Sequence, residues 1–312
     1  MNTRLIVLLE STFVAVALFV PSVAGAFALV SGDILISNHT GNNVQRLDPV
    51  SSTVTTLVST PSTPIGLAFD TSFNLFINTG NAIDKFDKNT NVLSTLFTGN
   101  GQREGLTFDP VTNNLFSVSF GANLIEQVDL AGNLVRTINI PGSTQLLGIS
   151  ARSGVLVVTD YGSGNVYLGT TTGSSFTTIG TVNPNNTYAP DIDAAGNIYV
   201  NNFGAGQVVK FTPAGGGTFT KSTFITGLQG PDNGLSIGDD GSFTISQFNA
   251  NEISIYNING TLRHDYLGVT SPDELVVFAP VRDNPHPAPE PGTLTLLVGA
   301  GLAFCWGVTR RS

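Results

Sequence analysis

Charged side chains are scarce in this sequence. Asp, Glu, Lys and Arg make up only 11% of the 312 residues, against roughly 25% in typical soluble domains. The thirteen basic residues are scattered, whereas a nucleic-acid-binding face needs them clustered to displace counterions from phosphates. We therefore expect no nucleic-acid partner. The net charge of −9 suits solubility or cation binding at a local site.

Cysteine and catalytic signatures are also scarce. Cys305 is the only cysteine, which excludes an intrachain disulfide and a cysteine-based zinc site. The sequence has no serine nucleophile elbow, phosphate loop, histidine–metal motif or dinucleotide fingerprint. These absences favour a protein that is not an enzyme, without settling the question.

The N-terminal residues 1–26 are predicted to be a secretory signal peptide. Arg4 provides a positive start, the residues from Leu5 to Val20 are mostly apolar, and Ala24-Gly25-Ala26 offers the small residues that signal peptidase requires. An uncleaved N-terminal membrane anchor is the alternative interpretation. Either way, this segment indicates export and is not expected to belong to the fold.

The C-terminal end has three parts in a fixed order. Residues 282–292 are a proline-rich linker that contains Pro289-Glu290-Pro291, and residues 293–312 are an apolar stretch with a basic tail at Arg310 and Arg311. The linker is expected to be stiff and extended. The apolar stretch is predicted to be a transmembrane helix whose basic tail stays in the cytoplasm.

This order resembles the PEP-CTERM sorting signal. The resemblance implies that an exosortase-type transpeptidase processes the chain near Pro289-Glu290-Pro291. It also implies a protein of the cell envelope, either anchored in the membrane or released to an extracellular matrix. An ordinary C-terminal membrane anchor is the alternative.

The segment 27–281 carries a repeat of about forty residues. Alternating strands that end in a polar residue recur, with steps of 41, 40, 41, 42 and 45 residues, at Ile34, Leu75, Leu115, Leu156, Ile198 and Phe243. An inner strand precedes this strand in most units, and two further strands follow it. Four strands at this period are typical of a β-propeller blade, so the sequence predicts an all-β fold of six four-stranded blades.

The first unit lacks its inner strand, and the end of the chain supplies one. The segment Asp273–Phe278 has the pattern of an inner strand. Pairing it with the strand that begins at Ile34 would close the ring and leave no exposed sheet edge.

The repeat text resembles NHL-type propellers and the regucalcin/gluconolactonase group. Residues 193–200 (DAAGNIYV) and 206–211 (GQVVKF) carry this likeness. The same fold hosts enzymes and binding proteins, so the resemblance predicts the fold and leaves the activity open.

Polar residues are predicted to converge on one end of the propeller axis, where each second strand ends and each inner strand begins. Such a funnel is a common place for ligands. The candidate face residues at the strand ends are Asn38, His39, Thr79, Ser119, Asp160, Asn202 and Gln247. A hydrated polar rim without a ligand is the alternative.

Four residues of the inner strands are candidate metal ligands: Glu104, Asp191, Asn233 and Asp273. Oxygen ligands of this kind suit Ca²⁺, and regucalcin-like propellers hold a divalent cation with Glu, Asn and Asp at inner positions. The resemblance therefore implies a cation site as an alternative, although no cofactor is required by the residues alone.

Aromatic residues recur just after the second strands, at Phe120, Tyr161, Phe203 and Phe248. They could stack on sugars, but packing between blades is the more usual role of a repeated aromatic. His39 occupies the same place in the first unit. NHL-like lyases use a histidine on this face, whereas a lone histidine beside a turn is usually a solvated side chain.

We therefore expect an exported, envelope-sorted propeller that binds or scaffolds a polysaccharide or a matrix protein, after processing by signal peptidase and an exosortase. The alternative is a divalent-cation-dependent lactonase or lyase of the regucalcin-like or NHL-like type.

Overall fold

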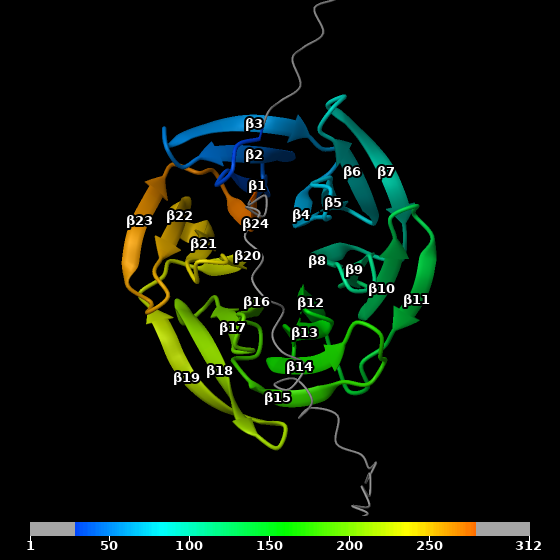
Figure 1. The fold of residues 1–312 in the computed structure, drawn as a ribbon, viewed down its shortest axis with the longest axis vertical. Coiled ribbons are helices and arrows are strands. Elements are labelled where there is room, and N and C mark those ends of the chain that lie inside the picture. The colour runs from blue at the N-terminus through cyan, green and yellow to red at the C-terminus, as the bar shows by residue number, and fades with distance from the viewer. Residues whose placement is uncertain (1–28, 279–312) are drawn as a thin grey trace, which may run out of the picture.

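The fold is a ring of six four-stranded antiparallel blades around a central axis (Figure 1). The computed structural model describes residues 29–278, and these confirm the predicted all-β, six-bladed propeller. The predicted signal peptide (1–26), linker (282–292) and sorting helix (293–312) lie outside the described residues, as do Pro289, Glu290, Pro291, Arg310 and Arg311. Within residues 29–278, no helix has the length and apolar character needed to span a membrane.

Each blade contributes one strand to the innermost layer, nearest the axis. These inner strands are β4 (Pro64–Phe69), β8 (Arg103–Asp109), β12 (Leu146–Arg152), β16 (Thr187–Ile192), β20 (Pro231–Ile237) and β24 (Pro272–Val277). The second strands are β1 (Ile34–Asn38), β5 (Leu75–Thr79), β9 (Asn114–Ser119), β13 (Val155–Asp160), β17 (Ile198–Asn202) and β21 (Phe243–Gln247). Their starts agree with the predicted repeat to within one residue.

The outer half of each blade is less buried than the inner half. The third strands are β2 (Asn43–Asp48), β6 (Ala82–Asp87), β10 (Leu124–Asp129), β14 (Asn165–Thr170), β18 (Gln207–Gly215) and β22 (Glu252–Tyr256), with a short 3₁₀ turn η1 (Phe248–Ala250) before β22. The outermost strands are β3 (Thr53–Ser59), β7 (Val92–Thr98), β11 (Leu134–Ile138), β15 (Thr177–Thr181), β19 (Thr218–Thr226) and β23 (Leu262–Leu267).

The two ends of the described chain share one blade, as predicted. Strand β24 pairs antiparallel with β1, and Ile34 lies opposite Val277 and Ile36 opposite Leu275. The closure continues past the strands, because Phe278 exchanges backbone hydrogen bonds with Gly32 and Asp33. Residues about 240 positions apart therefore complete a single sheet, which removes the edge that an open array would expose.

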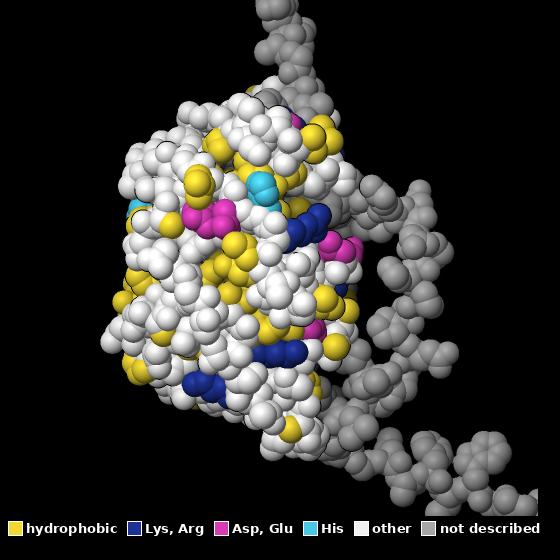
Figure 2. All heavy atoms as spheres, turned by 90° about the vertical axis from the view of Figure 1, so that its left-hand side faces the viewer, with side chains coloured by type: hydrophobic (Ala, Val, Ile, Leu, Met, Phe, Trp, Pro, Cys, Tyr) yellow, Lys and Arg dark blue, Asp and Glu magenta, His cyan; other side chains and the backbone are white. Residues whose placement is uncertain are grey.

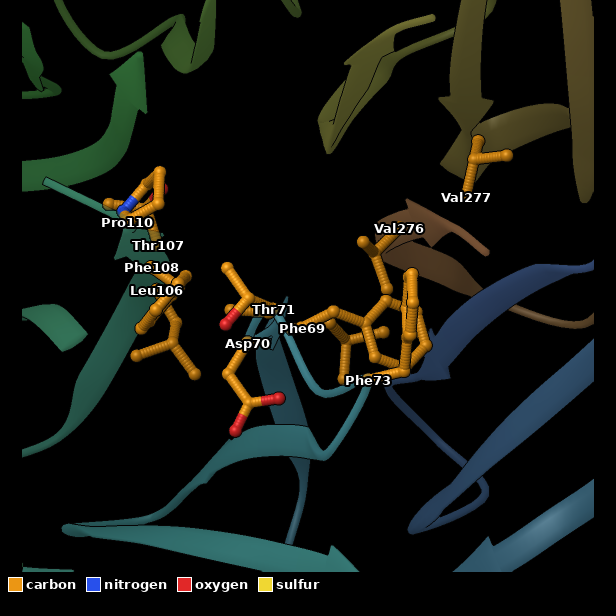
Figure 3. Close-up of a pocket in the computed structure, with 12 residues that line it drawn as sticks. Phe69, Asp70, Thr71, Phe73, Leu106, Thr107, Phe108, Pro110, Val276 and Val277 are labelled. Atoms are coloured by element: carbon orange, nitrogen blue, oxygen red, sulfur yellow. The ribbon is translucent and has the colours of Figure 1, made fainter. Parts of the chain in front are cut away.

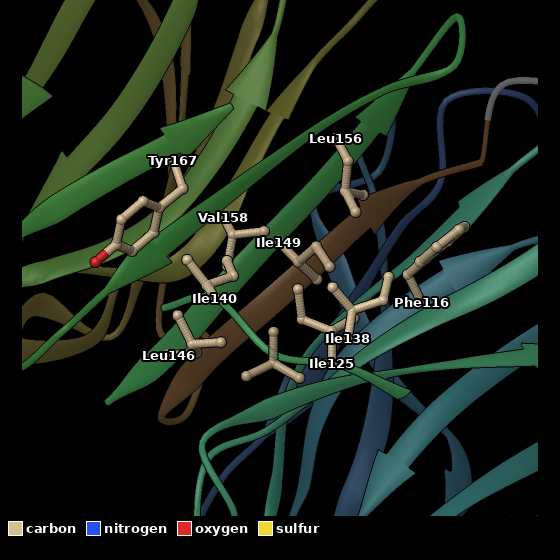
Figure 4. Close-up of a cluster of buried hydrophobic side chains, with 10 residues drawn as sticks. Phe116, Ile125, Ile138, Ile140, Leu146, Ile149, Leu156, Val158 and Tyr167 are labelled. Atoms are coloured by element: carbon tan, nitrogen blue, oxygen red, sulfur yellow. The ribbon is translucent and has the colours of Figure 1, made fainter. Parts of the chain in front are cut away.

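The hydrophobic core is divided among the blade-to-blade interfaces. Alternating apolar residues of neighbouring sheets meet in clusters, and one cluster joins Phe116 and Ile125 of one blade to Leu156 and Val158 of the next (Figure 4). At roughly 25 cal/mol per Å² of buried apolar surface, these contacts supply the main stabilisation. The surface in Figure 2 carries isolated charged side chains on a mostly uncharged background, as the composition predicts.

All six inner strands share one irregularity near their start. Each pairs regularly with its second strand except at one place, where two or three inner-strand residues lie opposite a single residue of the second strand. In β8, for example, Glu104 and Gly105 fall between the paired residues Arg103 and Leu106. Such bulges redirect side chains and are common beside functional sites.

The bulges leave little space between neighbouring inner strands. A β-carbon added at Gly66 would lie 2.4 Å from the carbonyl oxygen of Glu104, and one added at Gly234 would lie 2.9 Å from that of Asp273. Glycine therefore permits the close approach of the strands around the axis. We call the end of the axis where the inner strands start and bulge the upper face, and the opposite end the lower face.

Candidate functional site

The six predicted residues at the second-strand ends are buried and form hydrogen bonds within the fold. Asn38, Thr79, Ser119, Asp160, Asn202 and Gln247 are all at most 4% exposed. Their side chains bond mainly to loops and neighbouring strands of the same sheet. Asp160 accepts from the backbone amides of Thr144 and Gln145, and Gln247 accepts from that of Gln229. These residues stabilise the connections around the upper face, and only His39 of the predicted set is substantially exposed, with 44% of its side chain accessible.

A second set of residues at the upper end of the inner strands consists of the first residues of the six bulges. They occupy equivalent positions in the strand pairing, directly after the residue that pairs with the end of the second strand. This set, which we call the bulge ring, consists of Ile65, Glu104, Leu147, Tyr188, Asp232 and Asp273. Three acids therefore occur in a ring that has no basic member.

A belt of buried polar side chains ties the bulges together from one blade to the next. Asn78 donates to the carbonyl oxygens of Glu104 and Gly105, and Asn201 does the same for Asp232 and Gly234. Each donor lies opposite its own bulge and bonds to the next inner strand in the ring. Thr159 and Ser246 donate to the carbonyl oxygens of Tyr188 and Asp273 in the same way. The belt satisfies backbone groups that the bulges leave unpaired.

The acids of the bulge ring influence one another electrostatically. Burial raises the pKa of Glu104 to about 8, and the nearby charge of Asp273 contributes further. Burial and the charges of Asp273 and Glu104 also raise the pKa of Asp232 well above its usual value. Glu104 and Asp232 are each only 8% exposed. Perturbed acids that cluster in this way are a recurring feature of functional sites.

His39 completes this cluster from the end of the first blade. Its Nδ1 lies 2.8 Å from Oδ2 of Asp273, and the other oxygen of Asp273 accepts from Nδ2 of Asn233 at 2.8 Å. The hydrogen bond to Asp273 is the main cause of a raised pKa at His39, with the charges of Asp273 and Glu104 adding to it against the cost of burial. The imidazole is thus positioned by a buried acid, which in turn is positioned by an amide.

A chain of aromatic rings borders the acids. Phe120 contacts Tyr161, Tyr161 contacts Tyr188, and Tyr188 stacks on Phe203 with centroids 5.1 Å apart. On the opposite flank, His39 meets Phe248 edge to face at 6.0 Å. The rings bridge blades, as packing predicts, yet they are half-buried and belong to none of the buried hydrophobic clusters of the described residues. Part of each ring therefore remains accessible on the upper face.

The structure separates one of the four candidate metal ligands from the others. Glu104, Asn233 and Asp273 lie together at the upper face. Asp191 lies deeper, where it accepts from Oγ of Ser150 and from the backbone amide of Ile237. Sequence reasoning placed Asp191 at the start of its inner strand. Strand β16 begins earlier, at Thr187, so the first residue of its bulge is Tyr188 and not Asp191. Within the described part of the chain, no group of three or more His, Cys, Asp or Glu side chains is placed to hold a metal ion.

A small chamber of about 160 Å³ lies on the axis below the bulge ring, lined by parts of all six inner strands. Asp191, Asn233 and Glu274 are among its polar lining residues. Burial and the neighbouring charge of Asp273 raise the pKa of Glu274 well above its usual value. The Oδ1 atom of Asn233 is buried without a hydrogen-bond partner.

The lower face has a different chemistry. A hollow of about 480 Å³ opens there between β4, β8 and β24 (Figure 3). Its walls are largely apolar and include Leu106, Phe108 and Val276. Phe73 and Phe69 pack against Phe278 at 5.0 and 5.5 Å between ring centroids. No predicted functional residue lies here.

The sequence contained a signal for Asp232 and Tyr188 that was not used. Asp232 directly precedes the candidate ligand Asn233, and Tyr188 lies three residues before the candidate ligand Asp191. In both strands the bulge begins before the residue chosen from the sequence. An alignment of the bulges, rather than of the strand text, is needed to find these two residues.

No protein-family model and no curated protein matches the chain. Solved structures share its fold at low sequence identity. A chain from a nidogen/laminin complex has a TM-score of 0.69 at 17% identity, over 78% of this chain and 97% of that chain. Virginiamycin B lyase from Staphylococcus aureus has a TM-score of 0.61 at 16% identity, over 80% and 86%. A streptogramin B lyase has a TM-score of 0.57 at 20% identity, over 69% and 72%. This chain is therefore similar in fold to propellers of both binding and lyase type.

Proposed function

We propose that this protein is an exported propeller that binds a carbohydrate on its upper face. The observation that carries the proposal is the chain of half-exposed rings from Phe120 to Phe203, next to the acids of the bulge ring. Aromatic faces stack on the apolar faces of sugar rings, and nearby carboxyl groups accept hydrogen bonds from hydroxyl groups. A propeller with a binding role has a fold precedent in the nidogen/laminin complex.

The test is a glycan array probed with the full-length protein, compared with the variants Tyr161→Ala and Phe203→Ala. Loss of one stacking ring should weaken binding about fivefold to tenfold. Phe73→Ala on the lower face is the matched control, because it removes an aromatic ring far from the proposed site. If no glycan binds, or if Phe73→Ala weakens binding as much as Tyr161→Ala does, the proposal is wrong.

A second candidate function is lyase-type acid–base chemistry at the same face. It is favoured by the contact between His39 and Asp273, together with a nearby acid whose pKa of about 8 keeps it protonated at neutral pH. His39 would accept a proton from the substrate, and Glu104 would donate one to the leaving oxygen. Virginiamycin B lyase supplies the fold precedent.

This candidate predicts activity on a cyclic ester such as virginiamycin B and its loss in His39→Ala. Because His39 must be neutral and Glu104 protonated, the rate should rise through the pKa of His39 and fall above about pH 8. An activity that persists in His39→Ala would exclude His39 as the base. If the protein turns over no member of a panel of cyclic esters and lactones, the lyase candidate is wrong and only the binding function remains.

Export, anchoring and processing form the cellular part of the proposal. It is supported by the order of proline-rich linker, apolar stretch and basic tail in the sequence. Fractionation of the native cells should place the protein in the envelope or the medium, and mass spectrometry should find a C-terminus near Pro289-Glu290-Pro291. A cytoplasmic protein that keeps residues 1–26 would contradict it.

A further inference from the structure

We propose that the bulge ring binds an ammonium group, so that the preferred carbohydrate is an amino sugar with a free amine. The acceptor set is formed by Glu104, Asp232, Asp273 and the free Oδ1 of Asn233. This inference rests on the proposed carbohydrate binding and specifies the chemical class of the ligand.

The first support is the imbalance of charge at the upper end of the axis. Asp273 lies close enough to Glu104 and Asp232 to raise the pKa of both, and Glu104 also raises the pKa of Asp232. The cationic group that the structure places against them is His39, which contacts Asp273. Glu104 accepts a side-chain hydrogen bond from Gln102, and Asp232 has a backbone amide, that of Asn233, as its stabilising partner. Buried acids with so few donors favour a cationic ligand.

The second support is independent of charge. Asn233 is only 4% exposed, and its Oδ1 has no hydrogen-bond partner. The orientation of the amide is fixed, because its Nδ2 donates to Oδ1 of Asp273. Asn233 belongs to the bulge of β20 and also lines the chamber below the bulge ring, and its Oδ1 is left without a donor. A buried acceptor without a donor is costly, and an ammonium group brings three donors.

The aromatic border fits the same ligand. Tyr188 belongs to the bulge ring and stacks on Phe203, and Phe248 lies on the other flank beside His39. Aromatic faces attract cations through their quadrupole and also stack on sugar rings. An amino sugar satisfies both preferences at once, with its ring on the aromatic border and its amine among the acids.

Ligand binding should release protons from the site. The titratable groups that interact with Glu104 are Asp273 on β24, Asp232 on β20, Tyr188 on β16 and His39 after β1. The corresponding residues on β4 and β12 are the apolar Ile65 and Leu147. Since Glu104 is largely protonated at neutral pH, an ammonium group that binds beside it lowers its pKa, and the displaced proton leaves for solvent.

The experiment is isothermal titration calorimetry of the full-length protein at pH 6.5 with two probes of equal length. One is the tetramer of β-1,4-linked glucosamine, and the other is the tetramer of N-acetylglucosamine, which lacks the charge. We expect the glucosamine tetramer to bind about tenfold to a hundredfold more tightly, the range for a charge-assisted hydrogen bond. Glu104→Gln should remove most of this preference and leave the affinity for the neutral tetramer within about twofold.

Two controls isolate the site. Asp239→Asn makes the same acid-to-amide change at an exposed position, 79% accessible, in the loop after β20 on the lower face, and it should change neither affinity. Repeating the calorimetric titration in two buffers of different ionisation enthalpy gives the number of protons released when the ligand binds. Wild type should release more than Glu104→Gln, and ionisation of the ligand itself cancels in this difference. Asp232→Asn is the second variant if Glu104→Gln does not fold.

The outcomes separate this inference from the proposed function. If both tetramers bind equally, or the neutral one binds better, the ammonium site is wrong while carbohydrate binding stands. If Asp239→Asn lowers affinity as much as Glu104→Gln does, the preference comes from net charge and the inference is overturned. If neither tetramer binds, the inference also fails, and the glycan array decides whether the proposed function fails with it.

Discussion

The two ends of the same six inner strands have opposite chemistry. At the upper face each strand bulges, and the bulges carry three acids, a tyrosine and two aliphatic residues. At the lower face the pairing is regular, and β4, β8 and β24 enclose an apolar hollow. The comparison shows that one irregularity, repeated six times, changes which residues a strand presents near the axis.

Because of this difference, the lower end of the inner strands contributes to stability, whereas the upper end carries the candidate site. At the lower end the pairing is regular, and Phe69 of β4 packs there with Phe73 of the following loop and with Phe278 after β24. The bulges at the upper end interrupt this regular pairing and place Glu104 and Asp232 in a buried position at a cost in stability. Arrangements that lower stability in this way are retained where a function requires them.

The largest expected effect comes from a buried ion pair directly beside the upper face. Arg103, which is fully buried, pairs with Glu126 and also donates to Oγ of Ser117 at 2.7 Å and to the carbonyl oxygen of Asn81. Arg103→Leu leaves Glu126 buried and unpaired, so the free energy of unfolding should fall by about 3–5 kcal/mol. Urea denaturation measures it. The double variant Arg103→Leu with Glu126→Leu should recover most of the loss, and no recovery would show that packing rather than charge was lost.

A slightly smaller effect is expected from the lower face. Phe278→Ala removes a ring that packs on Phe69 and Phe73 beside the closure of the propeller. Unfolding should become easier by about 3 kcal/mol, as for other large-to-small core changes. Ligand binding at the upper face should stay within about twofold of wild type. Weakened binding would show that the two ends of the strands are coupled, which would break the separation drawn above.

Most of the fold follows from the sequence because its signals are local and repeated. Alternating strands at a period near forty residues define the blades, and the unmatched segment Asp273–Phe278 identifies the closure. The sequence signal is weak for an outer strand such as β23 (Leu262–Leu267), which is exposed at most positions. Outer strands of a propeller bury little surface, so their pattern is weak.

The candidate site was predicted only in part, for a physical reason. Glu104, Asp273 and His39 lie at the site, as expected from the repeat. Asp191 does not, and Asp232 was missed, because bulges add residues to the inner strands without any change in the second strands. Simple alternation fails where a bulge shifts the register by one residue. Contacts between blades, such as that of Asn201 with the carbonyl oxygen of Asp232, join residues far apart in the sequence, so local patterns do not predict them.

The third prediction concerns the dependence of stability on pH. The pKa of Glu104 is raised from 4.5 to about 8 in the folded protein, so the folded state holds a proton that the unfolded state has already released. Stability should therefore fall as pH rises from about 4.5 to about 8. Glu104→Gln removes the part of this dependence that comes from Glu104 and should stabilise the protein at pH 8 by an amount on the order of a few kcal/mol. Urea denaturation at pH 5 and pH 8 compares the two proteins. Parallel profiles would mean that Glu104 is ionised in the folded state.

The smallest effect is expected at His39, whose side chain is the most exposed of the cluster. Because the hydrogen bond to Asp273 raises its pKa above 6.5, the pair contributes to stability below pH 6.5, and the contribution is lost as pH rises through the pKa of the folded state. A histidine proton titration by NMR should show this raised pKa, and Asp273→Asn should return it toward 6.5. If the pKa of His39 is unchanged in Asp273→Asn, the acids of the bulge ring do not act on the imidazole. The upper face would then differ from the lower face in shape and burial but not in the coupling of its charges.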